Sequence, residues 1–184
     1  MNESLAQNKK DGKKKVTSFK NKVVQMRRVS KTVKGGKNLT FSAVIIVGDS
    51  KGKVGLGLGR ANDANLAIER ATFAAKKNLL QVPLTKNDSI PYVVQGKFGA
   101  CNVLIKPAKA GTGVIAGGPV RTVLELAGIK NVLAKQLGSN NIINNSQATI
   151  IALQQLQPIQ YLCTDRSISQ KIFRNRILNI FKNT

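Results

Sequence analysis

The stretch LTFSAVIIVGDSKGKVGLGLGRA, residues 39–61, predicts a β-hairpin in the first half of the chain. Apolar residues occupy every second position from 39 to 47, and the positions between them also become apolar along the segment. This period of two is typical of a strand that is buried on both faces over part of its length. Residues 48–52 are turn formers, so residues 53–58 are expected to form the return strand.

The segment that follows the hairpin, residues 62–80, is predicted to be an amphipathic helix. It is rich in Ala, Leu and Lys, and its broad apolar stripe includes Leu66 and Phe73. Asp63 is the expected N-cap residue of this helix. With an earlier strand that starts at Val23, the first unit is predicted to be β-β-β-α.

A second, α/β unit is predicted after a polar linker at residues 83–91. The expected elements are strands at 92–95 and 102–106, a glycine-rich loop at 111–118, a helix at 120–127, a strand at 129–137, a turn at 138–145 and a helix at 146–157. Pro119 suits the first position of a helix, and Gly128 suits a C-terminal cap. The sequence therefore predicts an α+β fold with two domains, residues 22–82 and 92–158.

Both ends of the chain are basic. Residues 1–37 hold 12 basic and 2 acidic residues, a net charge of +10 out of the +22 of the whole chain. Residues 1–21 lack an apolar period and contain closely spaced lysines, so we expect a disordered arm. The basic tail, residues 159–184, has apolar side chains at helical spacing within 167–181, which is compatible with a short amphipathic helix on RNA or protein.

The composition excludes several classes of function. The chain has 184 residues, 30 Lys and Arg against 8 Asp and Glu, and no histidine. Without histidine there is no imidazole base and no histidine metal ligand, which removes the commonest hydrolase and zinc-enzyme mechanisms. Such a positive chain is normally balanced by a polyanion, and nucleic acid is the leading candidate. We therefore expect a nucleic-acid-binding protein that has no cofactor and is not an enzyme.

The same composition bears on the compartment. Cys101 and Cys163 form no CxxC pair, which fits a reducing environment. The apolar runs are far shorter than the roughly 20 residues of a membrane span, and no cleaved leader is expected, so we predict a soluble protein without a membrane partner. The abundance of Lys, Asn and Ile is typical of AT-rich coding DNA. This favours a plastid origin, with a bacterial cytoplasm as the alternative.

Two glycine patterns resemble nucleotide-binding motifs without completing them. Gly55, Gly57 and Gly59 lie inside a predicted strand, and Arg60 stands where a dinucleotide fingerprint needs its third glycine. We expect these glycines to allow close backbone approach instead. The GxxxxG spacing that starts at Gly113 is followed by Pro and Val rather than the Lys and Ser or Thr of a phosphate-binding loop.

A basic segment at residues 27–37, RRVSKTVKGGK, is the strongest candidate for a binding site. Long cations stand beside short hydroxyl donors on a flexible Gly-Gly loop, the combination that contacts to phosphates require. Only 4% of the residues are aromatic and none is tryptophan, so base stacking has few platforms. Recognition of the backbone and shape of folded RNA is therefore the expected mode.

Three strings in this order and spacing resemble a known family. They are VSKTVKGGK, IIVGDSKGKVGLGLGRA and KPAKAGTGVIAGGPVRTVLELAGIKNVLAKQLGS. The chain resembles the family of the fifth protein of the small ribosomal subunit, of bacterial and organellar type, over roughly residues 22–157. The resemblance implies an N-terminal domain similar to double-stranded-RNA-binding folds, and a C-terminal α/β domain with a left-handed crossover.

The resemblance also implies partners and site residues. Members of the family contact ribosomal RNA near the head-to-body junction, line the path where mRNA enters together with the third and fourth small-subunit proteins, neighbour the eighth, and influence decoding accuracy. The residues expected to bind ribosomal RNA are Arg27, Arg28, Ser30, Lys31, Thr32, Lys34, Gly35, Gly36, Lys37, Lys51, Lys53 and Arg60. Those expected to contact the fourth protein are Gly111, Thr112, Gly113, Gly117, Gly118 and Arg121.

Two other functions remain as alternatives at this point. The net charge alone would permit a free RNA chaperone or an architectural nucleic-acid-binding protein. A nucleotide-binding enzyme that uses the glycine-rich loops is a weaker alternative, because its catalytic groups are missing.

Overall fold

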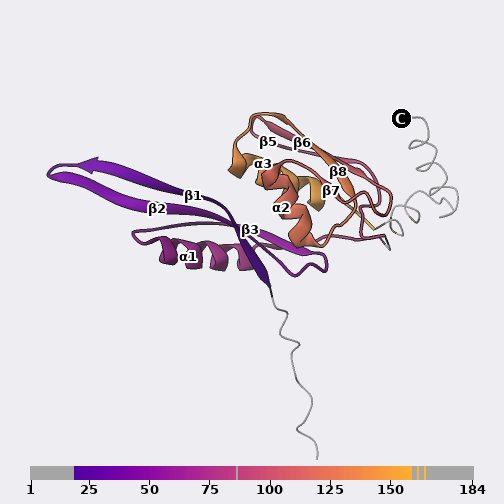
Figure 1. Cartoon of the computed structure of the whole chain (residues 1–184), viewed down its shortest axis with the longest axis horizontal. Coiled ribbons are helices and arrows are strands. Elements are labelled where there is room, and N and C mark those ends of the chain that lie inside the picture. Colours follow the sequence, from indigo (N-terminus) through magenta and orange to yellow (C-terminus); the bar gives the residue numbers. More distant parts are fainter. Residues whose placement is uncertain (1–18, 86, 159–160, 162–163, 165–184) are drawn as a thin grey trace, which may run out of the picture.

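The computed structural model describes residues 19–85, 87–158, 161 and 164, which form two four-stranded sheets with three helices. Figure 1 shows the N-terminal sheet with helix α1 on one side and the C-terminal unit on the other side. This two-domain α+β architecture confirms the predicted fold class. None of the helices in the described part of the chain is long and apolar enough to cross a membrane.

The N-terminal sheet has the strand order β1-β2-β3-β4 and is antiparallel throughout. Its elements are β1 (Lys20–Val33), β2 (Gly36–Gly48), β3 (Lys53–Ala61), α1 (Ala64–Lys77) and β4 (Leu79–Gln81). The β2–β3 hairpin is the one predicted from residues 39–61. In this hairpin Ile45 pairs with Gly57 and Val47 pairs with Gly55. Every second residue of β2 therefore lies on the same face of the sheet, as the alternation predicts.

Helix α1 packs on this sheet through small residues. Ala67, Ala71 and Ala75, at a spacing of four, are fully buried. A Cβ atom added at Gly57 would lie 1.9 Å from the carbonyl oxygen of Ala71, so only glycine lets the strand approach the helix backbone. The glycines of β3 therefore serve helix packing, as predicted, and leave no room for a pyrophosphate.

The C-terminal sheet has the order β5-β6-β8-β7, with α2 and α3 packed against it. Its elements are β5 (Val94–Phe98), β6 (Cys101–Pro107), β7 (Val114–Ile115), α2 (Gly118–Ala127), β8 (Val132–Gly138) and α3 (Ile142–Gln154). β7 and β8 are parallel and are joined through α2, so this unit is the crossover connection of the domain. Gly128 caps α2 with φ +90°, as predicted.

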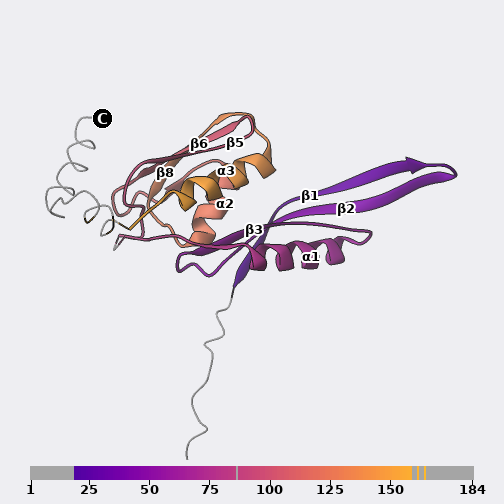
Figure 2. The same ribbon diagram turned by 180° about the vertical axis from the view of Figure 1, so that it is seen from behind.

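One hydrophobic core spans both domains. Ile46 and Val54 of the N-terminal sheet belong to the same buried cluster as Val123 and Leu124 of α2. The turn between β2 and β3 is fastened to the end of α2, because Gly52 N–H donates to the Ala127 carbonyl over 2.9 Å. The two domains are therefore packed against each other and are not separated by an extended linker (Figure 2).

Several predicted boundaries were wrong. The first strand begins at Lys20, so the last residues of the expected disordered arm are ordered. Helix α1 ends at Lys77 because the chain returns to the sheet as β4, where the prediction continued the helix to residue 80. Helix α3 begins at Ile142, inside the predicted turn, because Asn141 caps it by accepting the Ile143 N–H. The rest of the arm and the amphipathic segment 167–181 lie outside the described residues.

Candidate nucleic-acid interface

The β1–β2 hairpin extends beyond the rest of its sheet. The last residue of β3, Ala61, pairs with Phe41, so the rows from Val29 opposite Thr40 outward have no third strand. At about 3.3 Å per residue these rows extend the sheet by about 17 Å. Figure 1 shows this two-stranded ribbon projecting from the body of the molecule.

The predicted basic loop is mainly strand. Ser30, Lys31 and Thr32 lie in β1, and only Lys34 and Gly35 form the turn at the tip. The Gly-Gly pair is required there because Gly35 has φ +96°. The expectation of a flexible loop was therefore wrong, since cross-strand pairing holds these residues in a ribbon.

The register divides the side chains of the ribbon between two faces. Residues that pair directly across an antiparallel ladder share a face. The face on the side of α1 carries Arg28, Ser30 and Thr32 of β1, with Phe41, Leu39 and Lys37 opposite them. The face on the side of the second domain carries Arg27 and Lys31, and there Arg27 and Arg60 flank Ser42 in one row. The ribbon thus presents cations on both faces and at its tip.

The ribbon gains little stability from burial. Nearly all of its side chains are exposed, including the apolar Val33 (37%) and Leu39 (48%). A two-stranded hairpin that buries no core is marginal by itself. Its geometry can present cations to a partner from two sides at once, which suits contact with RNA backbone.

Lys51 and Lys53 lie far from this ribbon. They follow β2, whose 13 residues separate them from the tip by about 40 Å at about 3.3 Å per residue. Their N–H groups donate to Asp49 Oδ1 over 2.8 and 2.9 Å, which closes the turn that packs on α2. The structure therefore does not bring these two predicted RNA-binding lysines to the same site as the others.

The predicted protein-contact residues surround the start of α2. Gly111, Thr112 and Gly113 lie in the loop before β7, Gly117 and Gly118 stand at the N-terminus of α2, and Arg121 lies in its first half. Gly111 and Gly113 adopt φ of +93° and +76°, which side chains other than glycine rarely allow.

Asn131 organises this loop and was missed by the sequence analysis. Its Oδ1 accepts the N–H groups of Gly111 and Gly113 over 3.0 and 3.3 Å, and its Nδ2 donates to the carbonyl of Asn87 over 2.9 Å. The two glycine amides are thus already engaged and cannot cradle a nucleotide phosphate. The available signal was an asparagine inside a predicted strand, where asparagine is depleted.

Charged side chains bridge the domains beside this loop. Arg121 Nε donates to Glu125 Oε1 over 2.6 Å, and Lys22 Nζ of β1 lies 3.6 Å from Glu125 Oε2. The hydrogen bond from Arg121 and the charges of both cations hold the pKa of Glu125 below its ordinary value, against the effect of partial burial. Within the described residues, no three His, Cys, Asp or Glu side chains gather as metal ligands would.

Both domains match models of the same protein family. Residues 19–83 match the family model "Ribosomal protein S5, N-terminal domain", and residues 96–166 match "Ribosomal protein S5, C-terminal domain". A protein of Rhodomonas salina named "Small ribosomal subunit protein uS5c" is 51% identical over 157 residues, which cover 85% of this chain and 94% of that protein.

Cyanobacterial proteins named "Small ribosomal subunit protein uS5" are similarly close. The protein from Prochlorococcus marinus (strain MIT 9215) is 55% identical over 83% of this chain and 74% of its own length. The protein from Nostoc punctiforme is 50% identical over 86% of this chain and 91% of its own length. The two family-model matches, residues 19–83 and 96–166, include the ribbon and the glycine-rich loop.

Proposed function

Because this chain belongs to the ribosomal protein S5 family, we propose that it is a structural component of the small ribosomal subunit that holds ribosomal RNA through its β1–β2 ribbon. It acts by binding and not by catalysis. The observation that supports this role most directly is the ribbon, which carries cations on two faces and at its tip while burying almost nothing of its own.

The finer placement is part of the same proposal. The ribbon reaches RNA near the head-to-body junction of the subunit, and the loop at Gly111–Gly118 contacts the fourth small-subunit protein. The third and eighth proteins are neighbours, and the chain lines the path where mRNA enters and thereby influences decoding accuracy. Support comes from the family, and from the exposure of both the ribbon and much of the loop.

The host ribosome is proposed to be that of a plastid. The Lys, Asn and Ile bias of the sequence and the similarity to a plastid-type relative support this assignment.

The ribbon is tested by the double variant Lys31→Ala/Lys34→Ala. Each lysine that neutralises a phosphate contributes roughly 0.7–0.9 to the slope of log affinity against log salt. We therefore expect weaker binding to transcribed small-subunit ribosomal RNA and a slope that is shallower by about 1.5, measured by filter binding between about 50 and 200 mM salt.

The matched comparison is Lys51→Ala/Lys53→Ala, which removes the same charge at the far end of the sheet. This variant is expected to retain most of the affinity and the slope. Equal losses in the two double variants would show that overall charge, and not the ribbon, determines binding.

A further inference from the structure

The outward face of α1 carries large apolar side chains that the core does not use. Phe73 is 71% exposed and Leu66 is 46% exposed, although both belong to the predicted apolar stripe of this helix. The sequence interpretation was wrong for these two residues, because the glycines of β3 bring the sheet against the alanines of α1 and leave Leu66 and Phe73 outside that contact. An aromatic ring this exposed, beside a second large apolar side chain, is typical of a surface that binds a partner.

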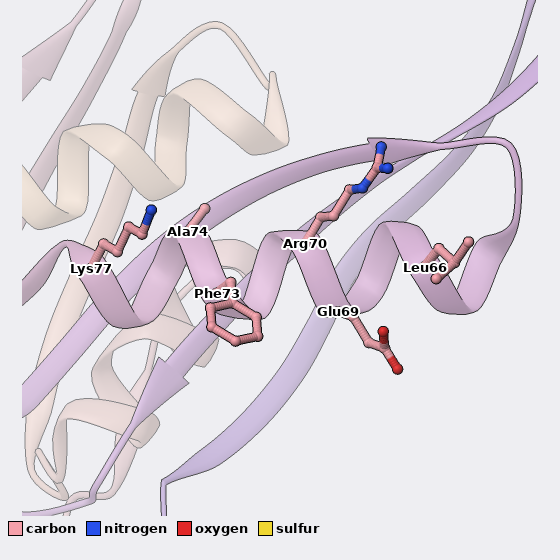
Figure 3. Close-up of a pocket in the computed structure, with 6 residues that line it drawn as sticks. All are labelled: Leu66, Glu69, Arg70, Phe73, Ala74 and Lys77. Atoms are coloured by element: carbon pink, nitrogen blue, oxygen red, sulfur yellow. The ribbon is translucent and has the colours of Figure 1, made fainter.

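Phe73 borders a shallow hollow of about 450 Å³ on the surface of α1. Figure 3 shows that Arg70, Ala74 and Lys77 line one edge of this hollow, and that Glu69 and Phe73 line the other edge. Arg70 and Lys77 are three residues before and four residues after Phe73, so their Cβ atoms lie about 5–6 Å from that of Phe73 on the helix surface. Two cations therefore lie one helical turn before and one turn after the exposed ring, on the opposite edge of the hollow.

The charge of this face favours a polyanion. Arg70 and Lys77 outnumber Glu69 among the residues that line the hollow. Arg70 is also anchored to the end of β3, because its Nη1 donates to the Arg60 carbonyl over 2.9 Å. The side chain of Arg60 itself lies on the opposite face of the sheet, with Arg27. The cations of α1 therefore share the side of the sheet that carries Arg28 and Lys37 of the ribbon.

We propose that the outward face of α1 is a second RNA contact, in which one unpaired base stacks on Phe73 while Arg70 and Lys77 hold the adjoining phosphates. An aromatic ring offers a stacking surface to an unpaired base, whereas a base inside a double helix cannot reach it. Cations near the ring neutralise the phosphates of the strand. The ribbon then binds RNA through backbone and shape, whereas α1 selects a looped or bulged nucleotide. This inference depends on the proposed function in one respect, which is that the ligand is RNA.

The test uses the full chain with Phe73→Trp, which introduces the single tryptophan of a sequence that has none. The emission of this indole is followed during titration with a single-stranded oligoribonucleotide and with a fully paired, blunt-ended RNA duplex at the same salt. We expect strong quenching by the single strand and little by the duplex. Phe73→Ala should bind the single strand about tenfold more weakly, a loss of about 1.4 kcal/mol.

Phe98→Ala is the matched control, since it removes an exposed aromatic ring (41%) from β5 of the other domain, and its affinity should stay within about twofold. Unchanged indole emission of Phe73→Trp at saturating RNA, together with unchanged affinity of Phe73→Ala, would overturn the proposal. An emission change with purified small-subunit proteins and not with RNA would overturn it as well, and would assign the face to a protein. Binding of ribosomal RNA through the ribbon is measured separately with the lysine variants, so either contact can fail alone.

Discussion

At the scale of single residues, the role of the glycines in β3 was predictable from the sequence. The alternation of glycine with Leu and Val in β3 predicted a close backbone approach, and α1 makes that approach at Gly55, Gly57 and Gly59. Phe73 shows its limit, because the same pattern of apolar residues cannot tell which ones a glycine-lined surface will exclude. The excluded residues become visible only when the helix is placed against the sheet.

Gly57→Ala is expected to destabilise the protein, because its methyl group would meet the Ala71 carbonyl and force α1 away from the sheet. Overpacking of this kind costs about 1–3 kcal/mol of the free energy of unfolding. Urea unfolding measures it, with Gly118→Ala as the control because a Cβ there meets nothing within 4 Å. A Gly57→Ala variant as stable as Gly118→Ala would contradict the packing described for α1 and β3.

At the scale of elements, the β2–β3 hairpin and the ends of α2 were predictable, whereas the ribbon, the start of α3 and the loop anchors were not. Turn chemistry and a period of two located β2 and β3, and Pro119 with Gly128 bounded α2. The ribbon was taken for a loop because its exposed residues are polar on both faces and show no alternation. The Asn131 contacts join segments 18 to 44 positions apart, and no local pattern signals them.

Asn131→Ala is expected to loosen the loop that begins at Gly111. The substitution leaves two glycine N–H groups and the Asn87 carbonyl without their side-chain partner. Because Gly111 and Asn87 are exposed and can bind water instead, we expect the loss of about 0.5–1.5 kcal/mol that is typical of each net hydrogen bond. Amide hydrogen exchange at Gly111 and Gly113 should become faster, and urea unfolding should occur at lower concentration. The exposed Asn140→Ala serves as the control. Exchange at both glycines as slow as in the unchanged protein would refute the anchoring role.

At the scale of the whole molecule, the two domains form one body that carries the ribbon. The linker predicted at residues 83–91 is polar on average, yet Ile90 is buried in the shared core and Ser89 Oγ donates to the Asn131 carbonyl over 2.7 Å. The exposed ion pairs of Glu125 add little, since pairs of this kind contribute about 0–1 kcal/mol. The buried cluster therefore holds the second domain against the sheet from which the ribbon projects.

Such a rigid body is suited to join one RNA surface to neighbouring proteins. The net charge of +22 predicted a polyanionic partner, and the family places that partner in the ribosome. Charge alone did not distinguish a free RNA chaperone from a ribosomal component. The ribbon, the engaged glycine loop and the match over both domains make that distinction together.

Sedimentation of an extract on gradients at low and high salt, with each fraction probed for this protein, tests the central claim most directly. The account predicts co-migration with small ribosomal subunits that withstands moderate salt, and release of Lys31→Ala/Lys34→Ala at lower salt than the unchanged chain. A protein that sediments free or with DNA, and is absent from the small subunits, would contradict the account.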